Sequence, residues 1–189
     1  MKTTGIILFL ILMTGTAIYA EDPQKDAMDG KELWNNKDWF IEGRVGRAFY
    51  MTHGTNVWGH EFGFVKTPGN CNSDMLWIMF SSDSDEIMNY IGKDVEFRIT
   101  VDGKAFRISV NMLGASKLFG TTKVMTFTNS YAGNDLISIL NKGKKLTLEI
   151  IGPKDFVKFL DISEDDFSLN GFIANRLKAK EMCDVLTLK

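Results

Sequence analysis

Short runs in which apolar and polar residues alternate, separated by turns that contain glycine, dominate the pattern of this chain. A period of two residues places every second side chain on the same face of a strand. The runs in the first half are rich in aromatic and β-branched residues, which favour strands. The pattern predicts strands over residues 38–44, 46–52, 57–65 and 75–81.

A hairpin over Val95–Met112 is the clearest of the predicted elements. Apolar and polar residues alternate on both sides of Asp102-Gly103, the residue pair that a type I′ turn prefers because glycine tolerates a positive φ. With a two-residue turn, Phe97 faces Ile108 across the two strands. All the apolar side chains of the hairpin then lie on one face, which is the register that a half-buried hairpin needs.

The polar face of this hairpin carries candidate binding residues. Arg98 lies directly opposite Arg107, and like charges at such positions repel each other. Glu96, which is diagonal to Arg107, or solvent can relieve the repulsion, and so can an anionic partner that docks on this face. Aromatic residues that the sheet leaves exposed would offer a second surface, and Trp39 and Trp58 are the candidates there.

The last third of the chain mixes strand and helix patterns. A short helix can be capped by Asn134 and ended by Gly143. A final helix has Phe172, Ile173 and Leu177 on its apolar stripe. The predictions are a strand over 124–128, a helix over 134–141, a strand over 145–151, a turn at 152–155 that leads into 156–162, and a helix from about 169 to 185.

The two cysteines, Cys71 and Cys183, predict a disulfide if the chain is exported to an oxidising compartment. Cys183 lies eleven residues after Phe172, close to three helical turns, so it sits near the edge of the same apolar stripe. A bond to Cys71 would pin the final helix to the sheet. The alternative is a pair of buried free thiols.

The first twenty residues have the three parts of a cleavable secretory signal. Lys2 supplies a positive end, residues 6–13 supply a short apolar core, and small residues lead to cleavage near Ala20, with Ala17 as a second position. A membrane anchor is the alternative, but the apolar core is shorter than the ~20 residues that span a bilayer comfortably. A polar lead-in over 21–33 and one domain over 34–189 are expected to follow.

Composition supports a folded domain for the exported part. Hydrophobic residues make up 44% of the chain, which excludes a disordered protein, and the formal net charge of −2 gives no electrostatic footprint for nucleic acid or anionic membranes. No stretch after the signal is apolar enough to span a membrane. We expect a mainly-β or α+β fold, an antiparallel sandwich with a short helix and a C-terminal helix.

No motif for catalysis, metal binding or a cofactor stands out. His53 and His60 are the only histidines, whereas zinc needs three or four ligands at characteristic spacing. Nucleophile elbows, glycine-rich phosphate loops and EF-hand spacing do not occur in the sequence. The acidic residues between Asp161 and Asp166 are predicted to form a solvated turn. We therefore expect no catalytic residue, no metal site and no cofactor.

Two segments resemble a family of bacterial proteins. Residues 136–148, LISILNKGKKLTL, are similar to the "helix, Lys-Gly, strand" segment of invasion-associated locus B proteins, and residues 166–172, DFSLNGF, resemble the entry to their last helix. The hairpin Val95–Met112 is compatible with the preceding strands of that family. The resemblance implies a small exported protein with a β-sandwich-like domain in the periplasm or cell envelope. It also implies interaction or virulence-associated roles, without established catalytic residues.

These features favour a periplasmic or secreted, non-enzymatic protein that binds another macromolecule, with a protein as partner and no nucleic acid. One alternative is an inhibitor or immunity-type protein, which would form a tight complex with one secreted enzyme. Another is an envelope hydrolase with unrecognised carboxylates, which would need a cleft with convergent acids of perturbed pKa. A small-ligand carrier would need an apolar cavity inside the sandwich.

Overall fold

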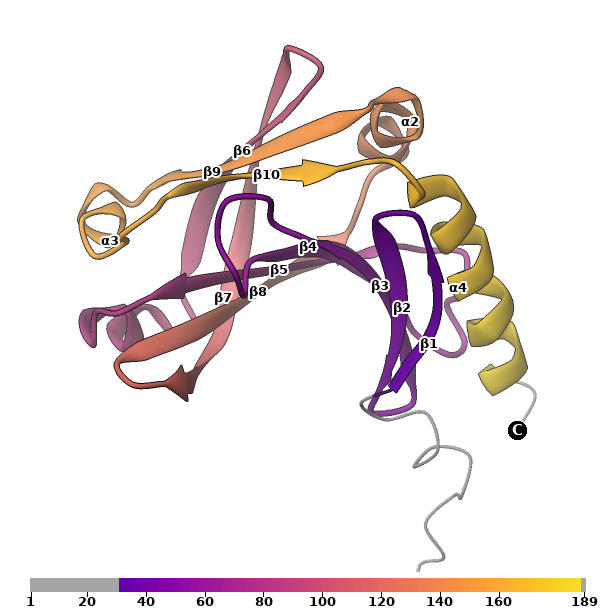
Figure 1. The fold of residues 1–189 in the computed structure, drawn as a ribbon, viewed down its shortest axis with the longest axis horizontal. Helices are drawn as coiled ribbons and strands as arrows, with labels where there is room; N and C mark the ends of the chain where they lie inside the picture. The colour runs from indigo at the N-terminus through magenta and orange to yellow at the C-terminus, as the bar shows by residue number, and fades with distance from the viewer. Residues whose placement is uncertain (1–30, 188–189) are drawn as a thin grey trace, which may run out of the picture.

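The computed structural model describes residues 31–187, in which ten strands form one antiparallel sheet (Figure 1). The predicted signal peptide and residues 21–30 of the predicted lead-in lie outside the described residues. The order across the sheet is β1-β2-β3-β4-β5-β8-β7-β6-β9-β10. The strands are β1 (Lys31–Asn36), β2 (Trp39–Arg44), β3 (Arg47–His53), β4 (Glu61–Lys66), β5 (Met75–Ser82), β6 (Asp94–Val101), β7 (Lys104–Phe119), β8 (Thr122–Tyr131), β9 (Lys145–Gly152) and β10 (Glu164–Ser168).

Short helices connect some of these strands, and a longer helix follows the last one. The 3₁₀ helix η1 (Glu86–Tyr90) joins β5 to β6, and α2 (Asn134–Lys142) joins β8 to β9. The single turn α3 (Lys154–Val157) joins β9 to β10, and α4 (Phe172–Thr187) follows β10. This β-rich α+β arrangement, with a short helix and a C-terminal helix, confirms the predicted fold class.

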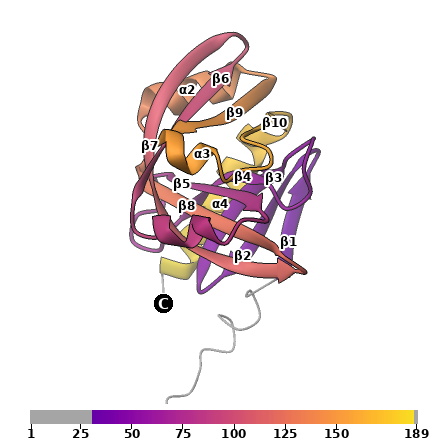
Figure 2. The same cartoon turned by 90° about the vertical axis from the view of Figure 1, so that its left-hand side faces the viewer.

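The sheet folds over so that its strands form two facing layers, as Figure 1 shows. β6, β9 and β10 belong to one layer, and β4, β5 and β8 belong to the other. The long strand β7 links the layers, because its first half pairs with β6 and its second half with β8. Figure 2 shows β7 running from one layer to the other. The two sides of the predicted sandwich are therefore parts of one continuous, curved sheet.

The last strand closes the fold by meeting the end of β3. Gly54, directly after β3, forms an isolated antiparallel bridge with Phe167 of β10. The Thr55 N–H group donates a hydrogen bond of 2.9 Å to the carbonyl oxygen of Asp166. These contacts join strands that lie far apart in the order of the sheet.

An apolar core fills the space between the layers and continues beneath α4. Phe172 of α4 packs against the inner face of the first strands, with its ring centroid 5.0 Å from that of Trp39 and 5.9 Å from that of Phe64. Burying one such ring contributes about 2 kcal/mol relative to leaving it exposed. A smaller cluster lies on the outer face of the sheet and consists of Phe49, Met51 and Val65.

A disulfide between Cys71 and Cys183 ties α4 to the β4–β5 connection, as the sequence predicts. The predicted apolar stripe of the helix is only partly right, because Ile173 and Leu177 are exposed while Phe172 and Cys183 are buried. The buried side of α4 runs through positions 172, 175, 179 and 183. Positions 175 and 179 carry Asn and Ala, so hydrophobicity alone pointed to the wrong side of the helix.

A buried group of charged and polar side chains also joins α4 to the sheet. Asp74 accepts hydrogen bonds from Arg176 of α4 (2.9 Å) and from the Tyr50 hydroxyl (2.5 Å), and it pairs with Lys66. Burial alone would raise the pKa of Asp74, but these three partners hold it below its ordinary value. Burial, reinforced by Asp74, raises the pKa of Tyr50 well above its ordinary value. The Asp74 carboxylate is thus paired with cations from both β4 and α4, and the group anchors the helix.

Several predicted boundaries differ from the structure. β1 begins at Lys31, inside the predicted polar lead-in. β4 begins at Glu61, four residues later than predicted, because the backbone N–H groups before it bond to the side chain of Asp165 rather than to a strand. Gly133, not Asn134, occupies the N-cap of α2.

The β6–β7 hairpin has the predicted register, with Arg98 directly opposite Arg107. Arg98 also faces Glu149 of β9, and its Nη1 lies 2.5 Å from Glu149 Oε2. Glu149 of the neighbouring strand β9, rather than Glu96, therefore relieves the repulsion between the two arginines. The hairpin sequence alone could not indicate this partner.

The Gly54→Ala substitution should destabilise the closure of the fold. A Cβ atom at residue 54 would lie 2.3 Å from Asp165 Oδ2 and 2.9 Å from His60 Cβ, and both neighbours are fully buried. We expect urea denaturation to show a loss of about 2 kcal/mol in the free energy of unfolding. Gly114→Ala in β7 is the matched control, because its methyl group would meet no atom within 4 Å. Equal stabilities of the two variants would contradict this account.

Candidate functional site

A pocket of about 300 Å³ opens between the β3–β4 connection, the end of β5, the β7–β8 turn and the segment between α3 and β10. Larger hollows of about 510 and 670 Å³ flank the β1–β2 turn, but the smaller pocket has a buried histidine in its wall. We call it the His60 pocket. It is lined by Val57, Trp58, His60, Ser81, Ser82, Asp83, Phe119, Thr122, Asp161 and Ile162.

Three side chains from separate segments of the chain form a series of hydrogen bonds at the floor of the pocket. His60, directly before β4, has its Nδ1 3.0 Å from Asp165 Oδ2 of β10. Its Nε2 lies 3.1 Å from Ser81 Oγ of β5. The imidazole ring also stacks on Phe80, with the ring centroids 4.1 Å apart. Stacking and hydrogen bonds together fix the orientation of the ring.

Asp165 is fully buried and holds the β3–β4 connection in place. Its Oδ1 accepts hydrogen bonds from the N–H groups of Asn56 (2.9 Å) and Asp166 (2.7 Å), and its Oδ2 accepts one from Val57 N–H (3.1 Å). Three backbone donors offset much of the cost of burying this carboxylate. The same carboxylate thus shapes the backbone of the connection and orients His60.

The partners of His60 determine its tautomer. A carboxylate only accepts hydrogen bonds, so Nδ1 carries the proton and donates to Asp165. Nε2 is then an acceptor for the hydroxyl proton of Ser81. Burial lowers the pKa of His60, and the nearby Asp165 carboxylate opposes this effect only in part. The neutral imidazole is therefore the favoured form at neutral pH.

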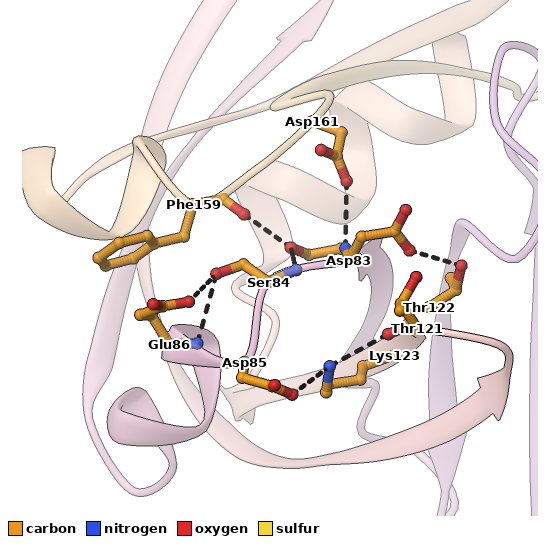
Figure 3. Close-up of polar contacts among 10 residues, drawn as sticks. Asp83, Ser84, Asp85, Glu86, Thr121, Thr122, Lys123, Phe159 and Asp161 are labelled. Carbon is orange, nitrogen blue, oxygen red and sulfur yellow. Dashed lines mark hydrogen bonds and ion pairs between the residues drawn. The ribbon is translucent and has the colours of Figure 1, made fainter.

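The acidic side of the pocket is a network around the start of the β5–η1 connection, shown in Figure 3. Asp161 Oδ2 accepts a hydrogen bond from the N–H group of Asp83 (3.1 Å), and Asp83 Oδ1 accepts one from the Thr122 hydroxyl (2.6 Å). Lys123 Nζ lies 2.6 Å from Asp85 Oδ1, beside this network. These contacts fix Asp83 and Asp161 at the mouth of the pocket.

The opposite side of the pocket is apolar. Trp58 is 74% exposed, and its ring centroid lies 5.8 Å from that of Phe119, which is 58% exposed. Ile162, also exposed, lines the same opening, and Leu118 is exposed next to Phe119 in sequence. Large apolar side chains gathered at the mouth of a pocket are typical of binding sites.

The structure separates the binding residues that the sequence predicted. Trp58 lies at the His60 pocket, in the exposed position that a binding role requires. Trp39 is fully buried and donates its Nε1–H to the carbonyl oxygen of Ser168, so the prediction of a surface role for it is wrong. Arg98 and Arg107 lie on the β6–β7 hairpin and do not line the pocket. Arg107 is exposed, whereas Arg98 is partly buried against Glu149.

Sequence reasoning missed the role of Asp165 by placing it in a solvated acidic turn. The structure puts it in β10, where Asp165 and Phe167 both point inward and Glu164 is exposed. The alternation of Asp165 with Phe167 and Leu169 was the available signal, because residues two apart in a strand share a face. No pattern in the sequence indicated that Ser81 lies beside His60.

Residues 31–187 contain no group of three or more His, Cys, Asp or Glu side chains arranged to hold a metal ion. The same residues include no helix with the length and apolar character needed to cross a membrane. The sequence matches no family model, and neither the curated proteins nor the solved structures include a match to it.

The stability of the protein should fall as the pH is lowered through about 6.5, the ordinary pKa of histidine. His60 has a lowered pKa in the folded state, so the unfolded chain binds its proton first and protonation favours unfolding. Asp165 faces the ring from β10, and Asp83 and Asp161 border the same pocket. We expect urea denaturation to show a slope of at most about 1.4 kcal/mol per pH unit from this residue, and the slope should fade as the pH rises above about 7.

The His60→Asn variant supplies the control. An asparagine amide can still donate to Asp165 but takes up no proton in this range. The slope of stability against pH just below about pH 6.5 should be smaller in the variant than in the wild type, whatever its absolute stability. An unchanged slope would show that His60 does not titrate in the way its burial requires.

Proposed function

We propose that this chain is an exported protein that binds another macromolecule, and that it docks its partner at the His60 pocket. The observation that carries the proposal is the exposed pair Trp58 and Phe119 at the mouth of the pocket. A tryptophan at 74% exposure leaves most of a large apolar ring in water. Binding a partner would remove that surface from water, which is the main source of affinity at such anchors.

The two walls of the pocket indicate the chemistry of the partner. Trp58, Phe119 and Ile162 form an apolar wall, and Asp83 and Asp161 form an acidic one. A cation between them would meet carboxylates on one side and an aromatic face on the other. The pocket therefore suits a protein segment that presents a lysine or arginine next to an apolar side chain.

Two observations support an exported location. The disulfide between Cys71 and Cys183 is of the kind that persists in oxidising compartments. Residues 1–20 have the charge and apolar pattern of a secretory signal. The resemblance of residues 136–148 and 166–172 to invasion-associated locus B proteins agrees with a periplasmic or envelope-associated binding role.

Trp58→Ala should weaken partner binding at least tenfold, because it removes the largest apolar contact at the site. The experiment uses the mature, oxidised chain as bait in envelope and secreted fractions. Captured proteins are identified by mass spectrometry, and their affinity for each purified variant is then measured. Leu177→Ala is the matched control, since Leu177 is 61% exposed on α4, at the other end of the molecule in Figure 1.

Asp161→Asn tests the acidic wall in the same assay. It should lower the affinity of the same partner and reduce the dependence of binding on salt concentration. A partner that binds wild type, Trp58→Ala and Leu177→Ala equally would place the interface elsewhere, with the exposed Arg107 face as the next candidate. The absence of any partner that binds in proportion to the bait would contradict the proposed role.

A further inference from the structure

We propose that Ser81 is a nucleophile that accepts an acyl group, with His60 as its general base and Asp165 as the residue that positions His60. This activity goes beyond partner binding and does not depend on it. Ser81 belongs to β5, His60 directly precedes β4 and Asp165 belongs to β10, so the closure of the sheet brings the three together.

The geometry satisfies the requirements for an activated serine. The nucleophile and its base must lie within hydrogen-bond reach, and a third group must orient the base. Ser81 Oγ is 3.1 Å from His60 Nε2, and His60 Nδ1 is 3.0 Å from Asp165 Oδ2. The buried carboxylate holds the tautomer in which Nε2 can accept the serine proton.

Ser81 is also open to a reactant from outside. It is only partly buried and lines the His60 pocket, whereas His60 and Asp165 are fully buried behind it. Asp165 already has its backbone donors and the Nδ1–H group, so holding the β3–β4 connection does not require Ser81. The hydrogen bond between Ser81 and Nε2 therefore adds a reactive group to a framework that is complete without it.

The reaction follows from these positions. Nε2 of His60 takes the proton of the Ser81 hydroxyl as Oγ forms a bond to the carbonyl carbon of an ester. The bond between that carbon and the alcohol oxygen then breaks, and the alcohol leaves with the proton from Nε2. Water repeats the sequence on the acyl-serine and releases the acid. The pocket of about 300 Å³, with an apolar and an acidic wall, favours small esters that carry an apolar or cationic group.

Burial supports the role of His60 as a base. It lowers the pKa of the imidazole, so the ring is unprotonated and able to accept a proton at neutral pH. Stacking on Phe80 prevents the ring from turning away from Ser81. Both effects make the base available without a prior conformational change.

The test is covalent labelling of the oxidised chain with an alkyl fluorophosphonate at pH 7.5. Ser81 Oγ would form a bond to phosphorus, the P–F bond would break, and fluoride would leave together with the serine proton. Intact-mass spectrometry should show one adduct, and fragmentation should place it on Ser81. This probe reports the nucleophilic step alone, which requires Ser81 and its base and no bound partner.

Three variants decide the outcome. Ser81→Ala should abolish labelling, and Ser84→Ala, which removes a nearby hydroxyl on the β5–η1 connection, should leave it unchanged. His60→Asn keeps a donor for Asp165 but lacks Nε2, so it should slow labelling at least a hundredfold. Tryptophan fluorescence and urea denaturation establish that each variant is folded.

Failure of the folded wild-type chain to form an adduct at Ser81 would overturn the proposal. Equal labelling rates in wild type and His60→Asn would also overturn it, because they would show that His60 does not act as a base. Neither result would bear on docking at Trp58, which is measured by partner affinity. If labelling occurs, hydrolysis of small acyl esters can then be measured. Hydrolysis by the wild type but not by Ser81→Ala would show that the reaction also turns over.

Discussion

The buried carboxylate of Asp165 holds the last strand of the sheet against the segment that follows β3. It sits on β10, the last strand in the ten-strand order, and it accepts hydrogen bonds from residues of the β3–β4 connection. Bringing distant strands of a curved sheet together buries backbone polar groups, and each of these costs free energy unless it finds a hydrogen-bond partner. Asp165 supplies acceptors for the N–H groups of Asn56 and Val57, which no strand satisfies.

This constraint explains why a glycine stands at position 54. The backbone must come close enough to β10 to form the bridge with Phe167 and to place the following N–H groups on the carboxylate. A side chain would occupy the position of Asp165 Oδ2 itself. The close contact between the backbone at Gly54 and the Asp165 carboxylate thus closes the sheet. It also sets the path of the β3–β4 connection, on which Trp58 is exposed.

The sequence was informative where local pattern decides structure and uninformative where distant segments meet. The register around Asp102-Gly103 follows from a turn preference and an alternation, both of which act within eighteen residues. Arg98 and Glu149 are 51 residues apart in the sequence. His60 is 21 residues from Ser81 and 105 residues from Asp165. No periodicity encodes such meetings. The cysteine pair was predictable because covalent pairing limits the choice of partner to one.

The buried carboxylates of Asp74 and Asp165 differ in what their partners do. The partners of Asp74 hold a helix in place, whereas those of Asp165 lead to a pocket. Asp74 is surrounded by Tyr50, Lys66 and Arg176, all of which hold α4 against the sheet. Buried ion groups of this kind add little net stability compared with apolar residues of the same volume, and their use here is to fix the position of a helix.

Asp165 differs because its chain of contacts leads outward. Through His60 it reaches Ser81, and Ser81 lines a pocket with Trp58 at its mouth. A histidine needed only for packing could be replaced by an apolar ring stacked on Phe80, as Phe172 is packed on Trp39 elsewhere in the core. The imidazole donates its Nδ1–H to the buried Asp165 carboxylate, and its other nitrogen, Nε2, reaches the accessible hydroxyl of Ser81, which is the arrangement that the proposed nucleophile requires.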